Sequence, residues 1–234
     1  MIRLLIHGAS GRMGQALVRL AGQDAEIIIA AGVILRSETM DRQYPFPLVM
    51  ADALLDVPAF DVAVSFALPE GIPPLIALCQ SRHVPLVCGT TGLDAACQEL
   101  FRQAATEIPV MWTANFSLGV AVVTECVRRV RQALSGWDCH IVETHHTQKK
   151  DAPSGTALTL AQAATTTGQG PQIASARAGD IVGEHLVQFT GAGERIEIIH
   201  RATDRDIFAR GALYVAKQLT QRNPGYYQIH DVLP

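Results

Sequence analysis

The first fourteen residues constrain the fold most strongly. Ile2–Ile6 is a short apolar run that leads directly into the glycine-rich segment Gly8–Gly14, and residues with the apolar spacing of a helix follow. This order of strand, glycine turn and helix is typical of a dinucleotide-binding unit. The glycines allow positive φ, let a pyrophosphate approach the backbone and let the helix pack closely on the strand. The spacing is G-x-x-G-x-x-G rather than the commoner G-x-G-x-x-G, and a tight turn without a ligand is the alternative.

Strands and helices alternate through the first half of the chain. The pattern predicts strands at 27–35, 61–66, 85–88 and 109–112, with helices at 74–81 and 94–106 between the last three. Such alternation favours a parallel sheet with helices on both faces. Because ligands of these sheets bind at the carboxyl ends of the strands, we expect four loops to meet in one crevice. They are Gly8–Gly14, Ser65–Glu70, Gly89–Gly92 and Thr113–Phe116.

The pattern changes after Ser117. It predicts a long helix over 118–135, a strand over 139–144, a loop with adjacent histidines, and a helix from Ser154 to about Thr167. Strand-like runs at 173–177, 185–190 and 195–200, with turns at Gly179, Gly183 and Gly191–Gly193, then predict an open-faced antiparallel sheet. The tail is expected to form a helix over 209–219 and a short extended segment over 229–233.

These elements predict an α/β protein with two domains. The first is a Rossmann-type, doubly wound parallel sheet over 1–116, to which residues 203–234 return. The second is an α+β domain over 117–202, where we expect substrate binding and oligomerisation. A chain of 234 residues that is 48% hydrophobic can bury such a core.

Composition excludes several other classes. The net charge of −3 gives no basic surface for nucleic acid or an anionic membrane. The five cysteines are widely spaced and lack a C-x-x-C pair, which favours reduced thiols over disulfides or a zinc site. The N-terminus shows no signal-peptide pattern, and the longest apolar run, 27–35, is too short to cross a bilayer. We therefore expect a cytoplasmic protein.

The candidate catalytic segment is residues 143–157, which read Glu-Thr-His-His-Thr-Gln-Lys-Lys-Asp-Ala-Pro-Ser-Gly-Thr-Ala. The Lys149 ammonium and the backbone amides of the helix that starts after Pro153 both favour anions, so the segment suits carboxylates. His146 adds a donor, and His145 is then available to move a proton. The alternative is a basic surface loop that caps a helix, since a short His-His-x-x-Lys pattern is weak by itself.

The chain resembles the 4-hydroxy-tetrahydrodipicolinate reductase (dihydrodipicolinate reductase) family over nearly its whole length. Several motifs occur in that family's order, and together they are far more specific than any one alone. They are Gly8-Ala-Ser-Gly11-Arg12-Met13-Gly14, Gly89-Thr90-Thr91-Gly92, Ala114-Asn115-Phe116-Ser117, His145-His146 with Lys149, Asp151-Ala-Pro-Ser-Gly155-Thr156-Ala, and Arg177-Ala-Gly-Asp-Ile-Val-Gly-Glu-His185.

The resemblance implies an oxidoreductase of lysine and diaminopimelate biosynthesis that reduces a small cyclic dicarboxylate with NAD(P)H. It implies His145 and Lys149 as catalytic acid/base groups, and His146, Gly155 and Thr156 as ligands of the substrate carboxylates. The residues that it implies for the cofactor are Gly8, Ala9, Ser10, Gly11, Arg12, Met13, Gly89, Thr90, Thr91, Thr113, Ala114, Asn115 and Phe116. Members of the family are usually homotetramers, and residues 173–201 are expected to supply the main subunit contact.

The chain departs from the family pattern at the expected adenosine pocket. Many members carry an acidic residue after the second strand, where this chain has Leu35 followed by Arg36. Without that carboxylate, and with Arg36 and Arg12 available for a 2′-phosphate, we expect NADPH to be preferred and NADH to be possible.

Two further departures concern loops. The family's Asp-Phe-Thr-x-Pro-Glu is replaced by Ser65–Glu70, which lacks the Asp, and the segment between the Thr156 helix and Arg177 is shorter than usual. The first change affects the loop expected to contact the cofactor. The second affects the geometry of the expected tetramer.

Other interpretations remain open at the level of sequence. A different dehydrogenase of the same superfamily would keep the glycine turn but has no reason to keep Lys149 with the Pro-Ser-Gly-Thr turn. A non-catalytic NADPH-binding protein would keep the turn without the His145 group. A metal site built from His140, Glu143, His145 and His146 is disfavoured, because adjacent residues of an extended chain point to opposite faces. His7 and His83 are expected to be structural or surface groups.

Overall fold

The computed structural model describes residues 1–35, 44–166 and 170–233. The chain divides into two compact units, the first built from 1–116 with the tail from Phe208, and the second from 117–207. Each unit has its own sheet and its own hydrophobic core.

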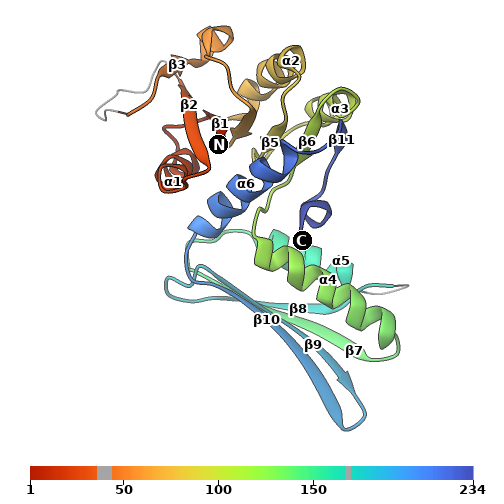
Figure 1. Ribbon diagram of the computed structural model, residues 1–234. Coiled ribbons are helices and arrows are strands. Elements are labelled where there is room, and N and C mark those ends of the chain that lie inside the picture. The colour runs from red at the N-terminus through yellow and green to blue at the C-terminus, as the bar shows by residue number, and fades with distance from the viewer. Residues whose placement is uncertain (36–43, 167–169, 234) are drawn as a thin grey trace. The chain divides into compact units, whose positions relative to one another are not determined.

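The first unit contains a seven-stranded sheet in the order β11-β6-β5-β4-β1-β2-β3, with every pairing parallel (Figure 1). The predicted parallel sheet is therefore confirmed. Its central strands are buried on both faces, as in sheets covered on two sides. The strands are β1 (Ile2–His7), β2 (Ile27–Ile34), β3 (Leu48–Met50), β4 (Val62–Ser65), β5 (Leu86–Cys88), β6 (Pro109–Trp112) and β11 (Gly225–Tyr226).

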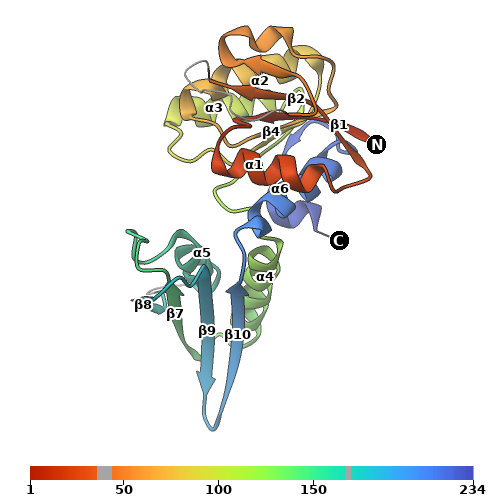
Figure 2. The ribbon, with the colours of Figure 1, turned by 90° about the vertical axis from the view of Figure 1, so that its left-hand side faces the viewer.

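Helices cover both faces of this sheet (Figure 2). Apolar side chains of α1 (Arg12–Ala21) and α6 (Asp206–Leu219) share one core cluster with β1 and β4, while α2 (Ile72–Arg82) and α3 (Ala95–Ala104) pack in a second cluster. Two short 3-10 helices lie in the connections: η1 (Ala51–Asp56) joins β3 to β4 and contacts α2, and η2 (Pro69–Gly71) leads from β4 into α2. From β1 the chain adds β2 and β3 on one side and then β4, β5 and β6 on the other. The switch point, where such sheets bind ligands, therefore lies between β1 and β4.

The tail differs from the prediction. Residues 229–233 were expected to be extended, but Ile229–Val232 form a 3-10 helix, η3, and the paired strand is β11 at Gly225–Tyr226. A capping box explains the helix, because the Gln228 and Asp231 side chains each accept from the other residue's backbone N–H.

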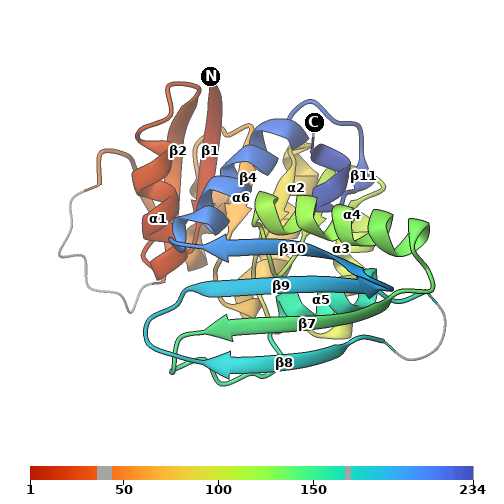
Figure 3. The same ribbon diagram turned by 90° about the horizontal axis from the view of Figure 1, so that it is seen from below.

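The second unit is a four-stranded sheet in the order β10-β9-β7-β8, with two helices on one face (Figure 3). The elements are α4 (Leu118–Ala133), β7 (Asp138–His145), α5 (Gly155–Ala163), β8 (Gln172–Arg177), β9 (Gly183–Gly191) and β10 (Glu194–Ala202). Buried residues of α4, α5, β7 and β9, including Val127, Leu160 and Phe189, form its core. In the described part of the chain, no helix covers the opposite face.

Three predictions for this unit need correction. The sheet is mixed rather than antiparallel, because β7 and β8 pair in parallel through the crossover helix α5. Gly183 opens β9 instead of forming a turn. Helix α5 ends at Ala163, and the predicted end at Thr167 lies outside the described residues.

No helix among the described residues is long and apolar enough to cross a membrane.

Candidate active site

The glycine turn after β1 has the geometry that its sequence predicts. Gly8 has φ of +85°, and a Cβ on Gly14 would lie 2.1 Å from the Gly8 carbonyl oxygen, so both positions require glycine. Helix α1 begins at Arg12 and has no acidic residue in its first turn. Such an N-terminus favours an anion.

A cavity of about 290 Å³ lies beside this turn. Its walls come from the carboxyl ends of three adjacent strands, and they include Gly8, Ser10 and Gly11 after β1, Ile34 and Leu35 after β2, and Phe66–Leu68 after β4. Ala9 is buried beneath the turn, whereas Arg12 is exposed and Met13 packs against the core.

The loops after β4, β5 and β6 contact one another. Thr90 is buried and its Oγ1 donates to the Ala67 carbonyl at 2.9 Å, while the Trp112 indole donates to the Thr90 carbonyl at 2.8 Å. A Cβ on Gly89 would lie 2.1 Å from the Phe66 ring, so this glycine permits close packing of two loops. The carboxyl ends of β1, β4, β5 and β6 thus lie on the same side of the sheet, since these strands are parallel.

The remaining predicted cofactor residues also follow the carboxyl ends of these strands. The Asn115 amide donates to Thr113 Oγ1 at 3.2 Å, which shapes the turn after β6, and Phe116 is 1% exposed with its ring against Phe66. Thr91 and Ala114 are exposed. Leu35 is 43% exposed at the cavity, whereas Arg36, the predicted 2′-phosphate ligand, lies outside the described residues.

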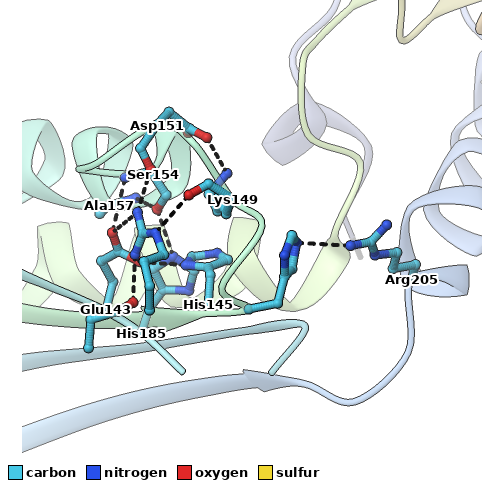
Figure 4. Close-up of polar contacts among 11 residues, drawn as sticks. Glu143, His145, Lys149, Asp151, Ser154, Ala157, His185 and Arg205 are labelled. Carbon is cyan, nitrogen blue, oxygen red and sulfur yellow. Dashed lines mark hydrogen bonds and ion pairs between the residues drawn. The ribbon is translucent and has the colours of Figure 1, made fainter. Parts of the chain in front are cut away.

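In the second unit, β7 carries Glu143 and His145 on the same buried face, since residues two apart in a strand share a face. The Glu143 carboxylate contacts His145 Nδ1 (Figure 4). It also accepts from both terminal nitrogens of Arg177, at 3.1 and 3.0 Å, and from the Ser154 amide at 3.3 Å. His145 thus belongs to a buried charge network rather than to a solvated loop.

The pKa values in this network follow from burial and pairing. Burial raises the pKa of Glu143, but hydrogen bonds from Arg177, Ser175 and His145 outweigh it and lower the value to about 2. Burial lowers the pKa of His145, and Glu143 only partly offsets that effect. Glu143 is therefore an anion at neutral pH.

Two more histidines continue the cluster across the sheet. The His185 ring meets the His145 ring edge-on with centroids 5.1 Å apart, and His200 lies 6.5 Å beyond His185. His185 Nε2 is 3.2 Å from the hydroxyl of Ser154, the N-cap of α5. Burial lowers the pKa of His185 to about 4, so its ring is neutral at neutral pH.

The loop between β7 and α5 holds the predicted substrate ligands. Arg205 Nη2 donates to His146 Nε2 at 2.9 Å, and Lys149 pairs with Asp151 at 2.9 Å. Figure 4 shows Lys149 and Asp151 beside the Glu143 cluster, with Arg205 farther away. Gly155 and Thr156 form the first turn of α5, where backbone amides suit a carboxylate.

Among the described residues, no three His, Cys, Asp or Glu side chains are grouped so as to hold a metal ion.

Family models cover both units. The model described as dihydrodipicolinate reductase, N-terminus, matches residues 2–116, and the one described as dihydrodipicolinate reductase, C-terminus, matches residues 119–233. The chain belongs to the dihydrodipicolinate reductase family.

Relatives in this family match over nearly the full length. The 4-hydroxy-tetrahydrodipicolinate reductase of Stenotrophomonas maltophilia (strain K279a) is 60% identical, and that of Xanthomonas campestris pv. campestris (strain B100) is 56% identical, each over 99% of this chain and 98% of the relative. Among solved structures, the dipicolinate-bound dihydrodipicolinate reductase from Paenisporosarcina sp. TG-14 covers 100% of both chains with a TM-score of 0.84. At 23% identity that likeness shows the shared fold.

The sequence motifs of this dihydrodipicolinate reductase family member did not connect Arg177, Ser154 and His185 with His145, the predicted catalytic histidine. From the sequence, Glu143 was interpreted only as a disfavoured metal ligand. The available signal was the alternation of Glu143 and His145 along one strand, which places them on one face. Arg177 gave no such signal, because its approach depends on the parallel register of β7 and β8, in which it pairs with His145.

Proposed function

We propose that this chain catalyses the NAD(P)H-dependent reduction of 4-hydroxy-tetrahydrodipicolinate to tetrahydrodipicolinate in lysine and diaminopimelate biosynthesis. The observation that carries this proposal is family membership along both units, with 60% identity to a relative of that name over 99% of the chain. The site residues support it, because the first unit has groups that suit the cofactor and the second has groups that suit the substrate and the proton transfer.

The first unit fits a nicotinamide dinucleotide. The positive φ of Gly8, the N-terminus of α1 and the cavity of about 290 Å³ beside them suit a pyrophosphate and an adenosine. We assign Gly8–Met13 to the pyrophosphate, and Gly89–Thr91 and Thr113–Phe116 to the rest of the cofactor. When bound, the reduced nicotinamide supplies a hydride.

The second unit fits the substrate. Its amide groups at Gly155 and Thr156, with His146 and Lys149, supply the cationic and N–H donors that two carboxylates require. The 4-hydroxyl group leaves as water to give the conjugated dihydrodipicolinate ring. Hydride addition to that ring leaves negative charge that a proton must neutralise. We assign that proton to His145, with Lys149 placed to hold a carboxylate and to assist as an ammonium.

Cofactor preference is a finer proposal. A carboxylate at position 35 would bind a ribose 2′-hydroxyl and repel a 2′-phosphate, whereas Leu35 does neither at the cavity. With Arg36 and Arg12 as cationic partners, NADPH should exceed NADH in kcat/KM by about tenfold, equivalent to about 1.4 kcal/mol. The double variant Leu35→Glu/Arg36→Ala should shift the ratio toward NADH; equal use of both cofactors by the wild type would refute this assignment.

The activity is tested by mixing the purified chain and NADPH with the freshly made condensation product of pyruvate and aspartate semialdehyde. NADPH consumption should require that product. Dipicolinate, which is bound to the Paenisporosarcina relative in its solved structure, should inhibit competitively. A chain that consumes no NADPH under these conditions, while it binds the cofactor, would instead be a non-catalytic NADPH-binding protein.

A further inference from the structure

Glu143 is a fully buried carboxylate at the centre of the second unit's polar cluster. An unpaired charge in such a position is strongly destabilising, and here Arg177 neutralises it through two nitrogens. The Ser154 amide occupies a further lone pair. Together with the Ser175 side chain, these groups hold the carboxylate in place beside His145 Nδ1.

The protonation states follow from this arrangement. Glu143 accepts hydrogen bonds from Arg177, and its pKa is lowered to about 2, so it is an anion and can only accept. The hydrogen between Glu143 and His145 therefore sits on Nδ1. Nε2 is then the ring nitrogen that takes up and releases a proton.

The residue next to Nε2 is a glycine and has no side chain of its own to cover this nitrogen. Gly183 opens β9, and a Cβ built on it would lie 2.9 Å from His145 Nε2. Any other residue would press on this nitrogen. The two nitrogens of His145 thus have opposite environments, one held by a carboxylate and the other beside a glycine.

We propose that Glu143 is a positioning residue for proton transfer, which holds His145 as the Nδ1–H tautomer and stabilises the imidazolium from which Nε2 delivers the proton. This inference rests on the proposed function, in which His145 protonates the reduced substrate. In that step the Nε2–H bond breaks, a C–H bond forms on the substrate anion, and neutral imidazole remains. Solvent then returns a proton to Nε2, and Glu143 stays anionic throughout.

The groups around His145 set the expected pH effect. Burial lowers the pKa of His145, and Lys149 and Arg177 lower it further, whereas the Glu143 carboxylate raises it. The neutral His185 ring packs against the edge of the His145 ring. Removing the Glu143 charge should therefore lower the pKa of His145 further. The protonated form needed for catalysis would then disappear at a lower pH.

Glu143→Gln tests this prediction, because glutamine keeps the size and loses the charge. We expect kcat to fall by about tenfold to a hundredfold with KM within about threefold, and the decline of kcat with rising pH to move to lower pH. Glu125→Gln, at an exposed carboxylate of α4 paired with Arg128, is the matched control and should leave both unchanged. An unshifted pH profile in Glu143→Gln would overturn the proposal.

A second measurement needs neither activity nor a folded Glu143 variant. Nitrogen-15 NMR of the wild-type chain, with His145 assigned by its loss in His145→Gln, should show neutral His145 protonated on Nδ1. An Nε2–H tautomer would overturn the proposal. If Nδ1–H is found in a chain that consumes no NADPH with the substrate, the proposed function fails while the Glu143–His145 pairing stands.

Glu143→Asp, which keeps a charge for Arg177, should retain more of the wild-type pH profile than the glutamine variant.

Discussion

At the scale of single residues, the histidine loop is expected to divide proton transfer from substrate binding. His145→Gln removes the proton donor, so kcat should fall by about a hundredfold or more with a smaller change in KM. His146→Gln and Lys149→Ala remove donors assigned to carboxylates, so both should also raise KM. Steady-state kinetics of the three variants separate these effects, and full turnover by Lys149→Ala would refute its role.

His7 gives a second prediction at this scale, because its burial makes stability depend on pH. The side chain is 3% exposed, its Nδ1 lies 2.9 Å from Ser65 Oγ, and burial lowers its pKa to about 4. The unfolded chain binds this proton more tightly, so the stabilisation is complete above about pH 6.5 and is lost as the pH falls towards 4.

His7→Asn should remove this dependence, since the asparagine amide replaces Nδ1 towards Ser65 and does not titrate. Between about pH 7.5 and about pH 4.5, denaturant titrations should show the variant losing about 2 to 3 kcal/mol less unfolding free energy than the wild type. Equal losses in the two proteins would show that His7 does not titrate with unfolding.

What sequence could predict at the residue scale depends on distance along the chain. The His145–Lys149 group and the Ser154–Thr156 turn are each formed by residues close together in the chain. Their motif and the helix cap can therefore be predicted from the sequence. The pairing of Glu143 with Arg177 joins two strands, and only the β7–β8 register brings it about.

At the scale of elements, the open face of the second sheet predicts assembly. On β10 the side chain of Ile199 is 42% exposed on the face away from the helices, opposite Leu186 of β9, so apolar groups face solvent in a single chain. We expect this face to pair with another copy of the chain in a closed symmetric oligomer. The family resemblance implies that this oligomer is a homotetramer.

Ile199→Lys should weaken that assembly without unfolding the chain, because the side chain is exposed in the monomer. Light scattering should show a smaller particle for Ile199→Lys and an unchanged one for Leu55→Lys, a control at a position 77% exposed in the first unit. Thermal unfolding measured at equal concentration checks that both variants are folded. A monomeric wild type at micromolar concentration would contradict the prediction.

The elements also show where sequence patterns fail. The five central strands of the first sheet are predictable because burial produces continuous apolar runs such as Ile27–Ile34. The edge strands β3 and β11 were not predicted, since they are only three and two residues long. Strand direction in the second sheet is not predictable either, since β8 has the same short polar-apolar pattern whether it pairs in parallel or not. The 3-10 turn of the tail depends on the reciprocal Gln228–Asp231 bonds, which local apolar spacing does not reveal.

At the scale of the whole molecule, we propose that one chain combines a cofactor unit and a proton-donating unit for a single reduction. The most direct test uses NADPH carrying deuterium at the transferred position of nicotinamide C4, with 4-hydroxy-tetrahydrodipicolinate freshly formed from pyruvate and aspartate semialdehyde. Mass spectrometry of the product should show tetrahydrodipicolinate with one deuterium for each NADPH consumed, and His145→Gln should slow its formation. Unlabelled product, or NADPH consumption that does not depend on the substrate, would contradict the account.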